Sequence, residues 1–282
     1  MKTKSSKSFF CFRTFLLLIL ILSMVFPRQA AKAATICVNP GGTDGCYASV
    51  QDAVSAAASG DAINIAPGTY VETGQIVISK NLTIVGADKA TTIIKPATDT
   101  GGAADAGAWI LIHDGITFKL SKVTLDGLGR QIRQAIRYKG SGTVDDVVIQ
   151  NMFYSTYEGW GIAMGFNSTT DMSLTVTNST FTNFGRVGIL VDGNNPHVSK
   201  ATISGNTFVG KGTGDHLDYA IEVGGGASAS ISGNDVSHCS GVASSDGSTS
   251  AGIYVHTYFD SGTTATISDN VIHDNSTGIT VG

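Results

Sequence analysis

Positive charge is scarce in this sequence. The 282 residues contain 18 Lys and Arg against 22 Asp and Glu, which gives a formal net charge of −4. Six of the basic residues and none of the acidic ones lie at positions 1–33, so the segment 34–282 carries a net charge of −10. Binding to nucleic acid needs a positive surface that neutralises phosphates. We therefore expect no nucleic-acid partner.

Long hydrophobic runs are absent after residue 26. The single run, TFLLLILILSMVF (14–26), follows a Lys- and Arg-containing segment and precedes the small residues AKA at 31–33. This order is typical of a signal peptide, and the run is too short to span a bilayer comfortably. We expect residues 1–33 to be a signal peptide and residues 34–282 to be secreted or at the cell surface, without a membrane span. A retained anchor is the alternative.

Cysteine is also rare, with four residues in the chain, of which Cys11 lies in the leader. Cys37 and Cys46 flank the turn-rich segment VNPGGTDG. In an oxidising compartment we expect these two to form a disulfide; a metal site is the weaker alternative, because no His or third Cys is near. Cys239 is left as an unpaired thiol, which we expect to be buried or partly buried.

The sequence repeats itself without any long helical pattern inside the repeats. One column of octets includes ATISGNTF (201–208), ASISGNDV (229–236) and ATISDNVI (265–272). Aligned on the last apolar residue, the octets end at Phe153, Phe181, Phe208, Val236 and Ile272. A second column recurs at a similar interval and contains Ile136, Ile162, Ile189, Ile221, Ile253 and Ile279. Two columns that share one period indicate a repeat protein.

Each repeat holds short alternating segments rich in Val, Ile and Thr, separated by Gly, Asn and Asp. This composition predicts two or three short strands per repeat. Strands that pair with their equivalents one coil away form a parallel β-helix with apolar ladders inside. The position two before each octet's end is polar and suits an internal turn ladder: Asn151, Ser179, Asn206, Asn234 and Asn270. The variable spacing predicts loops inserted at one corner.

The two ends of the repeat array differ. Residues 47–61 place Val50, Ala53, Val54 and Ala57 at helical spacing before Gly60, which predicts a short amphipathic helix that caps the first coil. The sequence stops at GITVG, inside the second column and without a cap. We expect the domain to be incomplete at its C-terminus.

The segment from Tyr47 to Pro96, with PGTYVE at 67–72 and NLTIVGA at 81–87, resembles the entry segment of the pectin-lyase-like superfamily. PGTYVE and NLTIVGA also resemble the start of pectin methylesterases. The resemblance implies an all-β fold, a right-handed parallel β-helix (solenoid) with an N-terminal capping α-helix, and carbohydrate as partner or substrate. The catalytic motifs of pectin methylesterases, polygalacturonases and alginate epimerases are missing, so Gln134 in RQAIRYKG inherits no role and no catalytic signature is found.

A candidate site follows from strand alternation. If the column isoleucines point inward, the residues one and three positions later share an outer face: among them Arg137, Lys139, Asp192, Glu222, Tyr254 and His256. The segments 154–160, 210–219 and 237–250 precede this column and would form one wall of a groove. Aromatic rings and arginines suit a sugar chain with carboxylates, and we assign substrate binding to Arg133, Tyr157, Trp160, Asp218, Tyr219 and Tyr254. A solvated surface is the alternative.

Two reactions suit this face. A uronate lyase needs charge neutralisation and a base: Arg137 or Lys139 are candidates, with Ca²⁺ on acids among Asp192, Asp215, Asp218 and Glu222. A glycoside hydrolase needs two carboxylates, here Glu222 with Asp192 or Asp218, and His216 or His256 can act as acid–base groups. The metal is unknown.

We interpret the chain as a secreted, monomeric β-helix protein that binds polysaccharide, with an acidic glycan as a candidate. A lyase or hydrolase acting on such a glycan, the lyase favoured, is the first alternative. A structural or adhesive module of a larger surface protein is the second.

Overall fold

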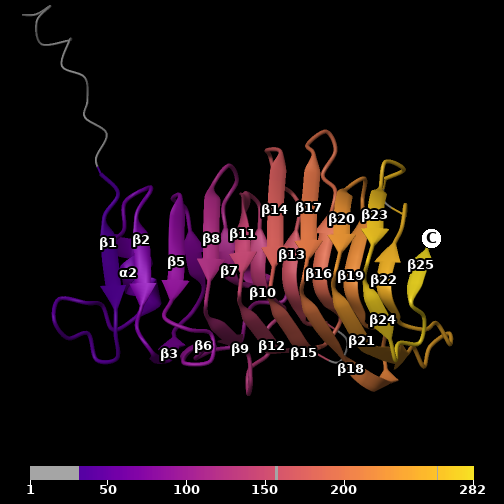
Figure 1. Ribbon diagram of the computed structural model, residues 1–282, viewed down its shortest axis with the longest axis horizontal. Helices are drawn as coiled ribbons and strands as arrows, with labels where there is room; N and C mark the ends of the chain where they lie inside the picture. Colours follow the sequence, from indigo (N-terminus) through magenta and orange to yellow (C-terminus); the bar gives the residue numbers. More distant parts are fainter. Residues whose placement is uncertain (1–31, 156–157, 259) are drawn as a thin grey trace, which may run out of the picture. The chain divides into compact units, whose positions relative to one another are not determined.

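The chain winds into successive coils of three strands, which stack along one axis from the indigo to the yellow end of Figure 1. The computed structural model describes residues 32–155, 158–258 and 260–282. Nearly all of the expected signal peptide and Tyr157 therefore lie outside the described residues. Within the described ranges, no helix has the length and apolar character needed to cross a membrane.

Three parallel sheets form the walls of the coil. Sheet A contains β1 (Thr35–Val38), β2 (Ala62–Ile65), β5 (Leu82–Gly86), β8 (Thr117–Ser121), β11 (Ser141–Asp145), β14 (Met172–Thr177), β17 (Ser199–Ser204), β20 (Ser228–Ser232) and β23 (Thr264–Ser268). Sheet B contains β3 (Gly68–Glu72), β6 (Thr92–Pro96), β9 (Thr124–Asp126), β12 (Val148–Met152), β15 (Thr180–Phe184), β18 (Thr207–Asp215), β21 (Asp235–Val242) and β24 (Val271–His273). Sheet C contains β4 (Ile76–Ile78), β7 (Ala108–Ile112), β10 (Gln134–Tyr138), β13 (Trp160–Met164), β16 (Val187–Asp192), β19 (Tyr219–Gly224), β22 (Ala251–Val255) and β25 (Ile279–Val281). The predicted all-β parallel solenoid is confirmed.

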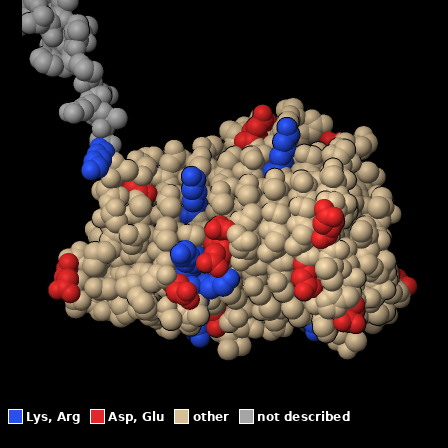
Figure 2. Space-filling view, viewed as in Figure 1, with Lys and Arg blue, Asp and Glu red and all other residues tan. Residues whose placement is uncertain are grey.

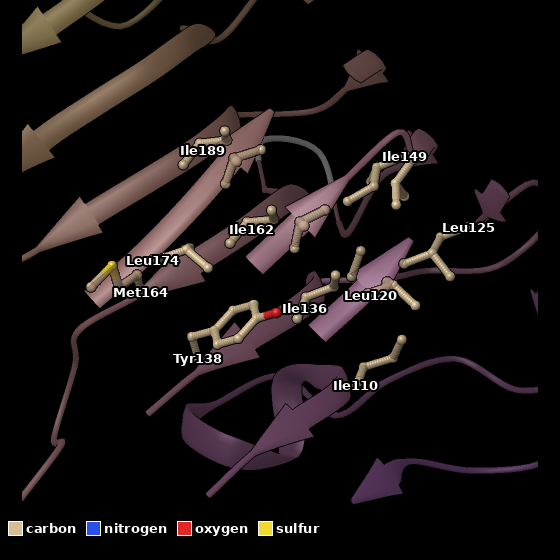
Figure 3. Close-up of a cluster of buried hydrophobic side chains, with 14 of the residues drawn as sticks. Ile110, Leu120, Leu125, Ile136, Tyr138, Ile149, Ile162, Met164, Leu174 and Ile189 are labelled. Carbon is tan, nitrogen blue, oxygen red and sulfur yellow. The ribbon is translucent and has the colours of Figure 1, made fainter. Parts of the chain in front are cut away.

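The predicted isoleucine column is a ladder of sheet C. Ile136 pairs in register with Ile162, and the same register continues through Ile189, Ile221, Ile253 and Ile279. The members from Ile136 to Ile253 are completely buried, and Ile279 is 45% exposed. Figure 3 shows Ile136, Ile162 and Ile189 pointing at Leu120, Leu125 and Ile149 of the other two sheets. The core is therefore one apolar column enclosed by three walls.

The polar ladder lies at the turn from sheet A to sheet B. The Oδ1 atom of Asn206 accepts a hydrogen bond from the backbone N–H of Ser179, and Oδ1 of Asn234 accepts from the backbone N–H of Asn206. Asn270 does the same for Asn234. Each amide thus fills the turn of the preceding coil, as predicted for these residues.

The alignment of the first octet was wrong. Ile149, not Phe153, pairs with Phe181, and the residue that donates to Ser179 Oγ is Val147. Asn151 lies instead inside β12, near its end, where its amide donates to Asp126 and accepts from Asn183. Asparagine suits both positions, because its backbone at β12 is left-handed, so spacing to an apolar residue cannot distinguish them.

A short helix packs on the first coil. Helix α2 (Val50–Ala56) buries Val50, Ala53 and Val54 and contacts β1, β2, β3 and β4, which is shorter than the expected range 47–61 because Ala57 already has extended backbone. The carboxylate of Glu72 accepts hydrogen bonds from the backbone N–H groups of Val50 and Gln51 and from Ser49 Oγ. The expected disulfide between Cys37 and Cys46 is present nearby in sequence, and Cys239 is a buried free thiol.

The segment that connects sheet B to sheet C differs in length from coil to coil. The interval from ladder residue to column isoleucine is short for Ser179–Ile189, longer for Asn206–Ile221 and longest for Asn234–Ile253, and it is short again for Asn270–Ile279. The segments 210–219 and 237–250 were expected to be loops, but their first parts extend β18 and β21, which pair as far as Asp215 and Val242. We call this variable connection the B–C corner.

Candidate functional site

The outer face of sheet C carries a second apolar cluster, separate from the solenoid core. Its buried members are Val187, Leu190, Tyr219 and Ala251, and Trp160, Phe166, Leu217 and Tyr254 pack against them. Trp160 and Phe166 stack with ring centroids 6.0 Å apart, and Tyr219 and Tyr254 lie 4.9 Å apart. We call Trp160, Phe166, Tyr219 and Tyr254 the aromatic band.

Register explains why these residues meet. Trp160 pairs with Val187, and Val187 pairs with Tyr219, so one row crosses β13, β16 and β19. A second row places Leu190 beside Glu222 and Glu222 beside Tyr254. The outward direction predicted for Glu222 and Tyr254 therefore brings them together on one face.

The basic end of the face is already neutralised. The Nε of Arg133 lies 2.9 Å from Glu158, the Nε of Arg137 lies 2.9 Å from Asp105, and Lys139 contacts Asp105 at 3.2 Å and Asp114 at 3.3 Å. Figure 2 shows, on one face of the molecule, a compact group in which blue and red side chains touch, within a largely uncharged surface.

These ion pairs change the roles expected for Arg137 and Lys139. Arg137 is 4% exposed, and its Nη2 also donates to the backbone oxygen of Phe166. Burial lowers the pKa of Arg137, while Asp105 raises it. Neither Arg137 nor Lys139 can serve as a base or neutralise a substrate carboxylate without giving up a carboxylate partner. The sequence could not reveal this, because Asp105 and Asp114 lie outside the repeated columns.

The other end of the face combines an imidazole with two carboxylates. Nε2 of His256 lies 3.2 Å from Oε1 of Glu222. Burial raises the pKa of Asp192 to about 6; the nearby His256 acts against this shift and Glu222 adds to it. Asp192 and His256 are 9% and 3% exposed. The three side chains predicted from strand alternation form one group, the Asp192–Glu222–His256 cluster.

Two further residues belong to this region: Gly224, which was expected to leave room for a bound chain, and Tyr258, for which no role was predicted. A Cβ placed on Gly224 would lie 2.3 Å from the His256 ring, so Gly224 provides the space in which that ring lies. Tyr258 places its ring centroid 5.2 Å from that of His256 and is 72% exposed. Gly224 occupies the outer row between Asp192 and His256, and a glycine between two polar residues could have indicated the space for the ring. Tyr258 follows β22, outside the repeated columns, so no pattern indicated it.

Asp218 was expected to bind substrate, and the structure places it inside the B–C corner. Its side chain is completely buried and accepts hydrogen bonds from Ser250 Oγ and from the backbone N–H groups of Lys211 and Gly241. It therefore orders the B–C corner from inside, and it is also out of reach as a calcium ligand or a hydrolase carboxylate.

The four expected calcium ligands do not form one site: Asp192 and Glu222 lie together, and Asp215 and Asp218 are engaged elsewhere. Asp215 is exposed, and its carboxylate accepts from the backbone N–H and the hydroxyl of Ser244, which holds its pKa at about 2. Within the described ranges, no three His, Cys, Asp or Glu side chains form a group that could hold a metal ion.

Two pockets open on either side of Trp160. The Gln134 pocket has a volume of about 230 Å³ and is lined by Ala104, Arg133, Gln134, Arg137, Trp160, Phe166 and Asn167. The Arg186 pocket has a volume of about 410 Å³ and is lined by Glu158, Trp160, Arg186, His216, Leu217, Ala243, Ser245 and Asp246. Residues from the expected groove wall at 210–219 and 237–250 thus do border this face. Gln134, Phe166 and Arg186 were not predicted to belong to it.

Solved structures with similar folds include carbohydrate-acting enzymes and a viral protein. A PL6 family alginate lyase, AlyGC, aligns with 18% identity and a TM-score of 0.49 over 86% of this chain and 40% of its own. A pectin methylesterase from Aspergillus niger aligns with 15% identity and a TM-score of 0.47 over 91% of this chain and 88% of its own. The ORF18 protein of Geobacillus virus E2 aligns with 14% identity and a TM-score of 0.38 over 96% of this chain and 66% of its own.

The chain thus spans about two fifths of the length of the alginate lyase structures that it matches. No curated protein sequence matches it. The family described as "right handed beta helix region" matches residues 134–282, the part of the chain that contains β10 to β25. The right-handed parallel β-helix expected from the resemblance to the pectin-lyase-like superfamily is thereby confirmed: the chain belongs to the right-handed β-helix family.

Proposed function

We propose that the outer face of sheet C binds a polysaccharide, and that the aromatic band is its main contact surface. The single observation that carries this proposal is the position of the band. Trp160, Phe166, Tyr219 and Tyr254 form a cluster outside the solenoid core, so the core does not need them. Aromatic faces pack well on the apolar faces of sugar rings, while polar groups around them fix orientation.

The dimensions also suit a chain rather than a single small molecule. The face runs from β10 to β22, four rungs apart in sheet C. Neighbouring strands lie about 4.8 Å apart, so this length is roughly 19 Å. The Arg133–Glu158 pair and the Asp192–Glu222–His256 cluster supply polar groups near its two ends. A secreted location, with residues 1–33 as the signal peptide, is part of this proposal.

The test is retention of the purified protein on a panel of immobilised neutral and uronate polysaccharides. We expect binding, and we expect Trp160→Ala and Tyr254→Ala each to weaken it while the protein stays folded. Tyr47→Ala is the matched control, because Tyr47 is a partly exposed aromatic residue of the N-terminal loop, away from sheet C. Unchanged retention of both face variants would refute the placement of the site.

Cleavage of the bound glycan is the second candidate, and the Asp192–Glu222–His256 cluster favours it. A carboxyl group with a pKa of about 6 can hold or release a proton near neutral pH. Glu222 beside His256 can orient the imidazole for proton transfer. The assay measures new reducing ends and ultraviolet absorbance of unsaturated products, with and without Ca²⁺. Binding without either product would leave recognition as the function.

A further inference from the structure

We infer that the Gln134 pocket is a subsite for an uncharged sugar residue. This inference rests on the proposed polysaccharide binding and adds the chemical class of one bound unit. The acidic glycan that the arginines of this face suggested is therefore not the ligand of this pocket. Three features of the pocket support the inference: its unsatisfied polar atoms, its balance of charge, and its size.

Gln134 contributes an acceptor that none of the described residues uses. Its side chain is 1% exposed, and its Oε1 atom is buried without a hydrogen-bond partner among the described residues. Trp160 lines the same pocket, and its Nε1 is also buried without a partner in that part of the chain. Buried polar groups are normally paired, and an unpaired one is destabilising. The Nε atoms of Arg133 and Arg137 also lack a hydrogen bond of good geometry, but each lies within ion-pair distance of a carboxylate. Apart from these two, one donor and one acceptor of the pocket remain for a ligand.

A sugar hydroxyl matches this pair of atoms. A hydroxyl group donates one hydrogen bond and accepts others, so one or two hydroxyls can donate to Oε1 of Gln134 and accept from Nε1 of Trp160. A carboxylate cannot donate at all when ionised. It would leave Oε1 of Gln134 unsatisfied, or repel it.

The charge around the pocket is balanced without a ligand. Both guanidinium groups that line it are paired, Arg133 with Glu158 and Arg137 with Asp105. Arg133 also donates to the backbone oxygen of Gly102. A ligand carboxylate would add a third negative charge to two cations, in a partly buried place where an uncompensated charge is costly. An uncharged ligand leaves both ion pairs intact.

The shape of the pocket fits one ring. Its volume of about 230 Å³ is smaller than the roughly 300–1,000 Å³ of sites for drug-sized ligands. Two of its lining residues, Trp160 and Phe166, are stacked aromatic rings with planes inclined by 15°. The pocket thus offers flat apolar surface and hydroxyl-binding atoms together.

The experiment compares neutral polysaccharides (glucan, mannan, galactan, xylan) with polygalacturonate and alginate, by titration calorimetry at low and high salt. Gln134→Leu removes the acceptor and keeps the apolar bulk. Gln150→Leu is the control, because Gln150 lies on sheet B and lines neither pocket beside Trp160. Melting temperatures of all three proteins are measured first, and Gln134→Leu should melt no lower than the parent.

We expect a neutral polysaccharide to bind with little dependence on salt, and Gln134→Leu to weaken it about five- to tenfold, the effect of one buried hydrogen bond. Gln150→Leu should bind like the parent. Salt-sensitive binding of uronate polymers alone would overturn this inference and leave the proposed function standing. Neutral binding that Gln134→Leu does not weaken would do the same. Absence of binding to every polymer would overturn both.

Discussion

The imidazole ring of His256 occupies the space that a side chain on Gly224 would take. A Cβ on Gly224 would lie 2.3 Å from Cε1 and 2.5 Å from Nε2 of that ring. Gly224→Ala should therefore displace His256, break its contact with Glu222, and lower stability by about 1–3 kcal/mol through overpacking. Urea denaturation measures the loss. Gly278→Ala, whose added methyl group meets only an ordinary contact with Ile272, should be close to neutral; equal effects of both would contradict the role given to Gly224.

Asn206→Ala tests the ladder at the turn from sheet A to sheet B. The amide of Asn206 accepts from the N–H of Ser179 and donates to the backbone oxygen of Val176 and to Asn234. Its removal leaves buried backbone groups without partners, and we expect the free energy of unfolding to fall by about 3 kcal/mol. Polysaccharide binding should remain. Asn64→Ala, at an exposed position of β2, should change the unfolding free energy by less than about 0.5 kcal/mol.

Asp192→Asn tests the raised pKa of the cluster. The pKa of Asp192 is about 6 in the folded protein, against about 3.9 for an unfolded chain. The folded state then binds the proton more tightly, so this group's contribution to stability is greatest below pH 4 and is lost as the pH rises to about 6. The amide in the variant cannot ionise. The variant's melting temperature, relative to the parent, should rise across this interval and stay higher above it; parallel curves would show that Asp192 has an ordinary pKa.

Glu72→Ala tests the attachment of α2 to the first coil. Glu72 is 2% exposed, and its two oxygens accept from Val50, Gln51 and Ser49. Charge-assisted bonds at a helix N-terminus are stronger than neutral ones, and we expect a loss of about 2–3 kcal/mol in chemical denaturation. Glu72→Gln keeps one acceptor oxygen, so its free energy of unfolding should lie between those of Glu72→Ala and the parent. Asp52→Ala, in the exposed first turn of the same helix, should lower the free energy of unfolding by less than about 1 kcal/mol. A larger loss would show that negative charge at the helix N-terminus, rather than the hydrogen bonds of Glu72, stabilises α2.

Much of the fold was predictable because a solenoid repeats one environment at each rung. The column isoleucines, the first of which is Ile136 and the last Ile279, occupy equivalent positions in successive coils. Their spacing alone therefore predicted the ladder and its two outer rows. The error at Asn151 has a physical cause. Its backbone has a φ of 60°, and the residues with left-handed backbone at the ladder turn are instead those before the amides, such as Gly205 and Gly233. An asparagine can thus be present because its amide bonds to a turn, as in the ladder, or because its backbone is left-handed, as at Asn151. The sequence pattern is the same in both cases.

The candidate site was less predictable, because its charges are balanced by residues outside the repeat. Alternation placed Asp192, Glu222 and His256 on one face, and the structure brings them together. Asp105 comes from a short 3₁₀ helix, Ala104–Gly107, whose position beside Arg137 no spacing rule gives. Asp218 looked like a loop carboxylate, but it is a buried support of the extended β18 and β21. Partners that meet only after the coil has closed are invisible to periodicity.

The B–C corner varies in length, whereas the sheet C wall beside it keeps one register. Residues that border the outer face and residues that support it are therefore different residues. The length of the corner varies from coil to coil, rising from Ser179–Ile189 to Asn234–Ile253 and falling again at Asn270–Ile279, and the register of sheet C stays unbroken on both sides. Whatever stands beside the outer face can thus be exchanged without redesigning the wall that supports it. For protein engineering, the corner is a graft position for segments that keep Asp218 and the hydrogen bonds by which it orders the corner.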